Sequence, residues 1–217
     1  LKLFMIKRTA DFYKELLKKF PYSPTEKQGE LLKLLSIFIF NEEKESLFLL
    51  KGYAGTGKTT TISAFVNTLA IAGKKAVLLA PTGRAAKVIA VYSKRPAFTI
   101  HKKIYFPKKQ TNGSVDFVLQ PNKHRDTIFI IDEASMIPDS RQNQKLFDSS
   151  SLLDDLISYV YSGHQCKLIF IGDTAQLPPV KLDVSPALEA DTLKYDYDKI
   201  VTEIELDEVM RQHENSG

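Results

Sequence analysis

The chain has 217 residues, 43% of them hydrophobic, which is enough for one well-packed core but not for two large ones. A single cysteine, Cys166, excludes an internal disulfide and a cysteine-rich zinc site and favours a cytoplasmic location. No run approaches the roughly 18 consecutive apolar residues of a membrane span, and the amino terminus lacks the features of a signal peptide, so we expect a soluble, unexported protein.

Charge is distributed unevenly along the chain. Thirty Lys and Arg against 26 Asp and Glu give a net charge of only +4, which does not by itself indicate a nucleic-acid partner. Six Lys or Arg accompany the single Asp116 between His101 and Arg125, whereas nine acidic residues lie between Lys181 and Met210. The chain therefore has a basic middle and an acidic end.

The first 45 residues are expected to form two helices. Apolar residues recur at helical spacing from Phe12 to Phe20 and again from Leu31 to Phe38. The segment Pro21-Tyr22-Ser23-Pro24 interrupts them, as a break between helices does. We treat residues 1–45 as a unit that precedes the main domain.

From residue 46 to 217, short apolar runs alternate with amphipathic stretches. The runs 46–50, 76–80, 127–131 and 168–171 are apolar on both faces, as buried parallel strands are. Residues 62–69, 84–92 and 152–161 have helical spacing, and residues 141–151 are polar, as in a loop. This alternation predicts an α/β fold with a doubly wound, mostly parallel sheet and helices on both faces.

One segment breaks this alternation. Residues 102–119 contain two β-like pieces around Thr111-Asn112-Gly113-Ser114, and Asn-Gly is the strongest short signal for a hairpin. We therefore expect a small inserted β-hairpin within residues 102–124.

A phosphate-binding loop follows the first predicted strand of the sheet. Residues 52–59 satisfy G-x-x-x-x-G-K-[ST] and lie between a strand and a helix, the context that this motif requires. Its glycines let backbone N–H groups face a phosphate, Lys58 places a positive charge near the β and γ phosphates, and Thr59 suits Mg²⁺. The alternative, a glycine-rich turn without a ligand, does not explain four fixed positions in this context. The expected contacts of ATP in and next to this loop are Gly52, Ala54, Gly55, Thr56, Gly57, Lys58, Thr59 and Thr60.

Two adjacent acidic residues end the strand-like run 127–131. An ATPase needs one acid for Mg²⁺ and one for the attacking water, and Asp132 and Glu133 suit these two roles. In the alternative interpretation Asp132 caps a helix and Glu133 lies in its first turn, which would stabilise the helix by roughly 1 kcal/mol.

Further motifs resemble those of superfamily 1 DNA helicases. Residues 171–180, Ile-Gly-Asp-Thr-Ala-Gln-Leu-Pro-Pro-Val, resemble the third helicase motif. Residues 80–86 and 99–101 resemble DNA-contacting motifs, residues 210–212 the fourth motif, and residues 25–28 the adenine-reading glutamine motif. The likeness is to the RecD and Dda branch, which moves 5′ to 3′ on single-stranded DNA. It implies a RecA-like P-loop domain, the first motor domain of such a helicase.

The resemblance also implies roles for single residues. It makes Gln28 an adenine contact, Gln176 a γ-phosphate sensor linked to the DNA groove, and Arg211 a second phosphate contact, so that Lys58, Glu133, Gln176 and Arg211 are the catalytic candidates. The implied DNA contacts are Pro81, Thr82, Arg84, Thr99, His101, Lys102, Lys103 and Phe106.

Several of these positions have a second interpretation. Gln28 is also the third helical residue of a Thr-x-x-Gln capping box, Asp173 suits a turn cap, and His101 suits a packed or surface histidine. The expected hairpin lies where the RecD and Dda branch carries a strand-separating pin, and its lysines and aromatic residues suit single-stranded DNA. Alternatively, it is a solvated hairpin whose aromatic side chains pack on the main domain.

Helicases of this family continue into a second RecA-like domain, for which this chain shows no motifs. Since an arginine finger accelerates P-loop enzymes by on the order of 10³ to 10⁵, we expect the 217 residues to bind ATP and Mg²⁺ but to hydrolyse ATP slowly. We expect a monomer that binds single-stranded DNA. A P-loop ATPase that remodels or loads a protein partner, and a nucleotide-gated single-stranded DNA-binding module, remain open, and the sequence does not distinguish DNA from RNA.

Overall fold

The structure is a computed structural model that describes residues 2–109, 111, 113–138, 151–173 and 185–208, with side chains from residue 7 onward. Its centre is a six-stranded sheet in the order β3-β2-β6-β7-β1-β8, and every neighbouring pair is parallel. The strands are β1 (Ser46–Gly52), β2 (Lys75–Ala80), β3 (Ala97–Thr99), β6 (Thr127–Ile131), β7 (Lys167–Asp173) and β8 (Ile200–Leu206).

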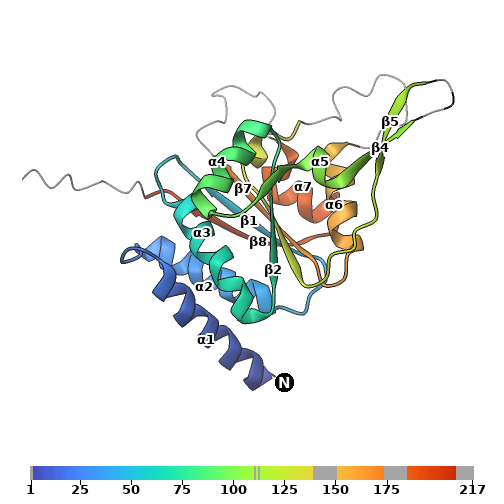
Figure 1. Cartoon of the computed structure of the whole chain (residues 1–217). Coiled ribbons are helices and arrows are strands. Elements are labelled where there is room, and N and C mark those ends of the chain that lie inside the picture. Colours follow the sequence, from blue (N-terminus) through green and yellow to red (C-terminus); the bar gives the residue numbers. More distant parts are fainter. Residues whose placement is uncertain (1, 110, 112, 139–150, 174–184, 209–217) are drawn as a thin grey trace, which may run out of the picture.

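Helices cover both faces of this sheet (Figure 1). One buried cluster joins alternate strand residues such as Phe48 and Ile130 to the four helices α1 (Lys2–Lys19), α2 (Glu26–Phe40), α3 (Lys58–Thr68) and α4 (Gly83–Ser93). A second cluster joins the other alternate residues, such as Leu49 and Phe129, to α5 (Ile100–Ile104), α6 (Leu152–Ser162) and α7 (Ala190–Tyr195). Successive strand residues point to opposite faces, so the central strands are apolar throughout. The predicted doubly wound α/β fold is confirmed.

The two amino-terminal helices have the predicted apolar stripes. Phe12 of α1 makes edge-to-face contacts with Phe40 at 6.0 Å and with Phe65 of α3 at 6.2 Å between ring centroids. This packing holds α1 and α2 against the helix that follows the phosphate loop. Among the described helices, none has the length and apolar character needed to cross a membrane.

The sequence interpretation missed β3, β8, α5 and α7. Strand β3 has only three residues, too few for a recognisable alternation. Strand β8 lies at the sheet edge and alternates exposed Glu203 and Glu205 with buried Ile204 and Leu206. It therefore lacks the continuous apolar run of the central strands.

The antiparallel strands β4 (Tyr105–Lys109) and β5 (Val115–Leu119) form a hairpin that extends away from the sheet (Figure 1). The base of the hairpin is fixed by polar contacts: the Tyr105 hydroxyl donates to Asp155 of α6 at 2.5 Å, and Gln120 Nε2 donates to the carbonyl of Lys103 at 2.8 Å. Lys102 and Lys103 themselves lie in α5, before the hairpin.

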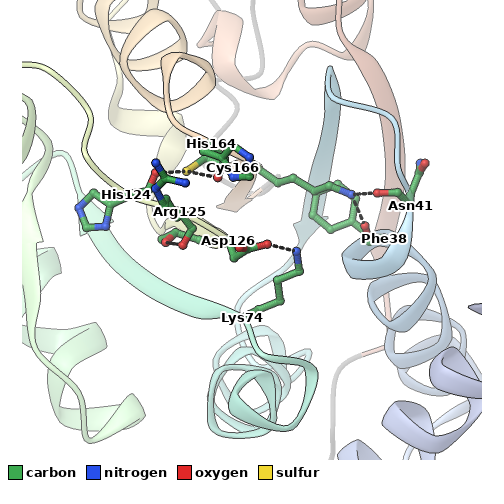
Figure 2. Close-up of polar contacts among 10 residues, drawn as sticks. Phe38, Asn41, Lys74, His124, Arg125, Asp126, His164 and Cys166 are labelled. Carbon is green, nitrogen blue, oxygen red and sulfur yellow. Dashed lines mark hydrogen bonds and ion pairs between the residues drawn. The ribbon is translucent and has the colours of Figure 1, made fainter.

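Polar contacts gather where the parallel strands begin (Figure 2). Lys74, just before β2, forms a 2.8 Å ion pair with Asp126, just before β6. The ammonium of Lys167, at the start of β7, donates to the carbonyls of Phe38 at 2.7 Å and Asn41 at 2.5 Å, at the end of α2. Lys167 is only 4% exposed, and this burial lowers its pKa to about 8. The amino edge of the sheet is thus tied together internally, whereas the candidate site lies at the carboxyl edge.

Candidate functional site

The phosphate loop connects the end of β1 at Gly52 to the start of α3 at Lys58. Gly57 is the N-cap of α3, with a φ of 89° that side-chain-bearing residues rarely adopt. A Cβ atom at Gly57 would also lie 2.5 Å from Gln28 Nε2. The backbone angle therefore favours glycine at this position, and a Cβ atom would also force the Gln28 amide to move.

Lys58 is held inside the loop. Its ammonium donates to the carbonyls of Gly52 at 2.6 Å and Tyr53 at 2.8 Å. Partial burial lowers the pKa of Lys58, and the negative charges of Asp173, Asp132 and Glu133 oppose this effect. The site thus has a cation facing three carboxylates.

Asp132 and Glu133 follow directly after β6. Burial raises the pKa of Asp132, the hydrogen bond that its side chain accepts from the Glu133 amide at 3.0 Å opposes this effect, and the neighbouring charge of Glu133 adds to it. The helix-capping interpretation of this pair is wrong, because only the three-residue 3-10 helix Ala134–Met136 follows and its N-cap Glu133 makes no side-chain cap hydrogen bond.

Glu133 adopts a left-handed backbone conformation, with φ 55° and ψ 38°. A non-glycine residue in this region costs about 1–3 kcal/mol, and such strain is concentrated at functional sites. With this backbone Glu133 does not continue into an α-helix, and the residue lines the cavity described next.

These groups line one cavity of about 900 Å³, a volume suited to a nucleotide. It brings the phosphate loop from Ala54 to Thr60 together with Gln28, Asp132 and Glu133, whereas Gly52, also expected to contact ATP, is not among the lining residues. Six further residues also line it: Phe20, Tyr22, Val88, Tyr92, Gly172 and Asp173.

The sequence interpretation did not assign Tyr22 or Tyr92 to the site. Tyr22 lies in the break between α1 and α2, and Tyr92 lies near the end of α4. Their side chains are 66% and 61% exposed, so each resembles an ordinary surface aromatic residue in the sequence. Neither residue belongs to one of the recognised motifs, so no local pattern assigns it to the site.

Gln28 forms the complete capping box with Thr25 that the sequence allows. The Thr25 hydroxyl accepts from the Gln28 amide at 3.3 Å, and Gln28 Oε1 accepts from the Thr25 amide at 3.1 Å. Gln28 Nε2 also donates to the carbonyl of Thr56 in the phosphate loop at 3.0 Å. The capping interpretation is therefore confirmed, and it coexists with a contact to the loop.

The helicase-like segments after β2 and β3 lie at the same sheet edge as the phosphate loop. Thr82 is the N-cap of α4 and Thr99 the N-cap of α5, and each hydroxyl oxygen accepts a backbone N–H at 3.2 Å. A hydroxyl that accepts a hydrogen bond keeps its own proton for donation to a phosphate. Arg84 and His101 are exposed beside them, and Pro81 is half-buried.

His101 is a surface histidine whose ring contacts that of Tyr105 at 5.6 Å between centroids. In the hairpin, Tyr105 packs on the main domain, whereas Phe106 and Phe117 are 41% and 70% exposed. Phe106 pairs with Val118 and Phe117 with Pro107, so the two rings belong to opposite faces of the hairpin. Lys102 is exposed and Lys103 half-buried.

Some predicted positions lie outside the described residues. These are Gln176 with most of the third helicase motif, Arg211 with the fourth motif, part of the hairpin tip and most of the loop predicted at 141–151.

Comparison with known proteins identifies a matching family and several similar helicases. Residues 39–217 match a family model described as an AAA domain. The chain is 33% identical over 135 residues to the ATP-dependent RecD2 DNA helicase of Deinococcus radiodurans, covering 62% of this chain and 16% of that protein. It is 31% identical over 143 residues to the ATP-dependent DNA helicase dda of Enterobacteria phage T4, covering 64% of this chain and 30% of the relative.

Two solved structures have a similar fold. A crystal structure of Pif1 helicase from Candida albicans has a TM-score of 0.50 and 26% identity, covering 88% of this chain and 41% of that one. A Pif1 helicase from Bacteroides, in complex with ADP-AlF3 and ssDNA, has a TM-score of 0.50 and 21% identity, covering 89% of this chain and 44% of that one. This chain therefore spans less than half the length of these relatives.

Proposed function

Since this chain belongs to the AAA domain family, as an ATPase domain of the superfamily 1 helicases similar to RecD and Pif1, we propose that it is the nucleotide-binding motor domain of an ATP-dependent 5′ to 3′ DNA helicase. The observation that carries the proposal is the cavity in which the phosphate loop meets Asp132 and Glu133. Single-stranded DNA is the proposed partner of a monomer in the cytoplasm.

The loop residues suit a bound triphosphate. The backbone of Gly55 and Gly57 has positive φ, and the amino terminus of the eleven-residue helix α3 lies at the cavity, where its dipole favours an anion. The Lys58 ammonium would exchange its carbonyl partners for phosphate oxygens. The side-chain oxygens of Thr59 and Asp132 are the hard ligands that Mg²⁺ prefers, and bound Mg²⁺ would offset negative charge on the phosphates.

Glu133 is the proposed water-orienting group. Its carboxylate lies at the same cavity as Lys58, and its strained backbone fixes its position after β6. We assign it to hold and deprotonate a water in line with the γ phosphate. Gln176 and Arg211 keep their proposed roles as γ-phosphate sensor and second phosphate contact.

A nucleic-acid contact at the carboxyl edge completes the proposal. Thr82 and Thr99 carry hydroxyl donors, and Arg84, His101 and Lys102 are exposed there. The exposed Phe106 and Phe117 supply stacking surfaces on a projecting hairpin, and each stacked base contributes roughly 1–3 kcal/mol. Together with the basic side chains of α5 and the hairpin, these exposed rings suit a nucleic-acid partner.

The test is ATP hydrolysis by the full-length protein with and without single-stranded DNA. Strong stimulation by DNA is the result expected of a motor. Hydrolysis without any response to DNA would favour a protein-remodelling ATPase. DNA affinity that changes with nucleotide while hydrolysis stays negligible would favour a nucleotide-gated binding module.

A further inference from the structure

The segment that leaves the hairpin runs to the amino edge of the sheet, opposite the nucleotide cavity (Figure 1). Residues 120–126 follow β5 and end where β6 begins. Asn122 holds this segment on α6: its Nδ2 donates to the carbonyl of Tyr159 at 2.9 Å, and its Oδ1 accepts from the His124 amide at 2.9 Å. The segment is therefore a fixed connection between the hairpin and the amino edge.

Two adjoining turns at this edge have the same strained backbone. Asp126, before β6, has a φ of 50°, and Gln165, before β7, has a φ of 53°. The Asp126 amide donates to the carbonyl of His164 at 2.9 Å, and Arg125 and His164 pair as an isolated parallel bridge. A non-glycine residue in this conformation costs about 1–3 kcal/mol, and such residues are concentrated at functional sites. Backbone hydrogen bonds thus hold the two turns, and the side chains they carry, in a fixed arrangement.

The side chains around these turns are mostly cationic. Residues 73–75, 122–126 and 163–165 contain a single carboxylate, Asp126, and Lys74 pairs with it at 2.8 Å (Figure 2). Within the described part of the chain, the exposed Lys75 and Arg125 form no ion pair. Their positive charges are therefore available to an anionic partner.

The positive charge continues from this edge toward the hairpin. Burial lowers the pKa of His124, and the charges of Lys103 and Lys75 lower it further, so His124 is close to both α5 and the start of β2. Lys123 is exposed next to it in the sequence. We define the amino-edge basic surface as Lys75, Lys123, Arg125 and His164.

The hairpin connects this surface to the proposed single-strand interface. Helix α5, which carries the exposed His101 and Lys102 of that interface, leads into the hairpin, and residues 120–126 lead out of it to the amino edge. A nucleic acid whose strands separate at the hairpin would therefore have a basic surface on each side of the point of separation.

The composition of the amino-edge basic surface suits a phosphate backbone. Lys and Arg neutralise phosphates without reading sequence. Surfaces for single strands add aromatic side chains on which bases stack, but residues 73–75, 120–126 and 163–165 contain no Phe, Tyr or Trp. From this arrangement we infer that the amino-edge basic surface binds the duplex arm of a forked DNA whose single strand lies at the carboxyl edge. The inference rests on the proposed function and adds a second nucleic-acid contact to it.

The experiment uses the full-length protein and compares a single strand with a forked DNA that has the same single-stranded tail. The double variant Lys75→Ala/Arg125→Ala removes two exposed cations of the surface. The matched control Lys14→Ala/Lys33→Ala removes the same charge at exposed positions on α1 and α2. The affinity of each protein for each DNA is measured from about 50 to about 200 mM salt.

We expect a change on the fork alone. The slope of log affinity against log salt concentration should become shallower by about 1.8 in Lys75→Ala/Arg125→Ala, since each phosphate of duplex DNA contributes about 0.9. Over this roughly fourfold range of salt, the loss of fork affinity should then be about tenfold smaller than in wild type. The slope on the single strand, and the ATP hydrolysis that the single strand stimulates, should match wild type. The control variant should match wild type on both DNAs.

Three outcomes would overturn the inference. An unchanged slope on the fork would leave these side chains as solvated charges. An equal change on the single strand and on the fork would assign them to the single-strand interface. An equal change in Lys14→Ala/Lys33→Ala would trace the effect to the net charge of the protein. A wild-type protein that binds neither DNA would instead refute the proposed function, and the inference with it.

Discussion

Replacing Gly57 by alanine tests whether the phosphate loop requires glycine for its backbone angle, for space, or for both. The φ of 89° imposes a penalty of roughly 1–2 kcal/mol on an L-residue. The new Cβ would lie 2.5 Å from Gln28 Nε2, and displacing that amide would break its 3.0 Å hydrogen bond to Thr56, a further loss of about 1 kcal/mol. Gly57→Ala should therefore lower the free energy of unfolding by about 2–3 kcal/mol.

Gly73→Ala is the matched control. Gly73 also has a left-handed backbone, with φ 68°, but no atom lies within 4 Å of the position that its Cβ would take. It should show the backbone penalty alone. Urea denaturation measures the loss of unfolding free energy in each variant. We assign the additional loss in Gly57→Ala to the displacement of Gln28. Equal losses of stability in the two variants would refute the steric part of this reasoning.

Three further predictions concern hydrolysis, nucleic-acid binding and pH. In the full-length protein, Glu133→Gln should retain ATP binding but lose turnover, and normal steady-state hydrolysis would contradict its assignment; Lys14→Ala, at an exposed position on α1, is the control. Alanine should also replace the basic residues of α5 and the hairpin, which are Lys102, Lys103, Lys108 and Lys109. The slope of log affinity for single-stranded DNA against log salt concentration should then become shallower by about 0.7 for each phosphate that these side chains neutralise. An unchanged slope would count against the proposed interface. Burial lowers the pKa of Lys167 from 10.5 in the unfolded chain to about 8 in the folded protein. Between these two pH values the unfolded chain binds more protons at this group than the folded protein does, so the contribution of Lys167 to stability should rise with pH. Thermal denaturation from pH 8 to 10 should show a smaller rise in Lys167→Met, and identical pH profiles would be inconsistent with a perturbed Lys167.

The accuracy of the sequence interpretation depended on how local each feature is. The central strands were recognisable because they are buried on both faces, whereas three-residue β3 and half-exposed β8 have no such pattern. At residues 132 and 133, helix capping was a reasonable alternative. The left-handed backbone of Glu133, which excludes that alternative, depends on packing that no local pattern reveals.

The sequence by itself determined the phosphate loop, the paired acids and the strand–helix alternation, because each is a property of neighbouring residues with a fixed spacing. The tertiary structure alone decided which distant segments meet. The strand order places β7 between β1 and β6, so Lys58 and Asp132 approach the same cavity from strands that are not neighbours. It also brings Tyr22 and Tyr92 to that cavity and Gln28 onto Thr56. Such contacts result from burying both faces of the sheet at once, which no local spacing encodes.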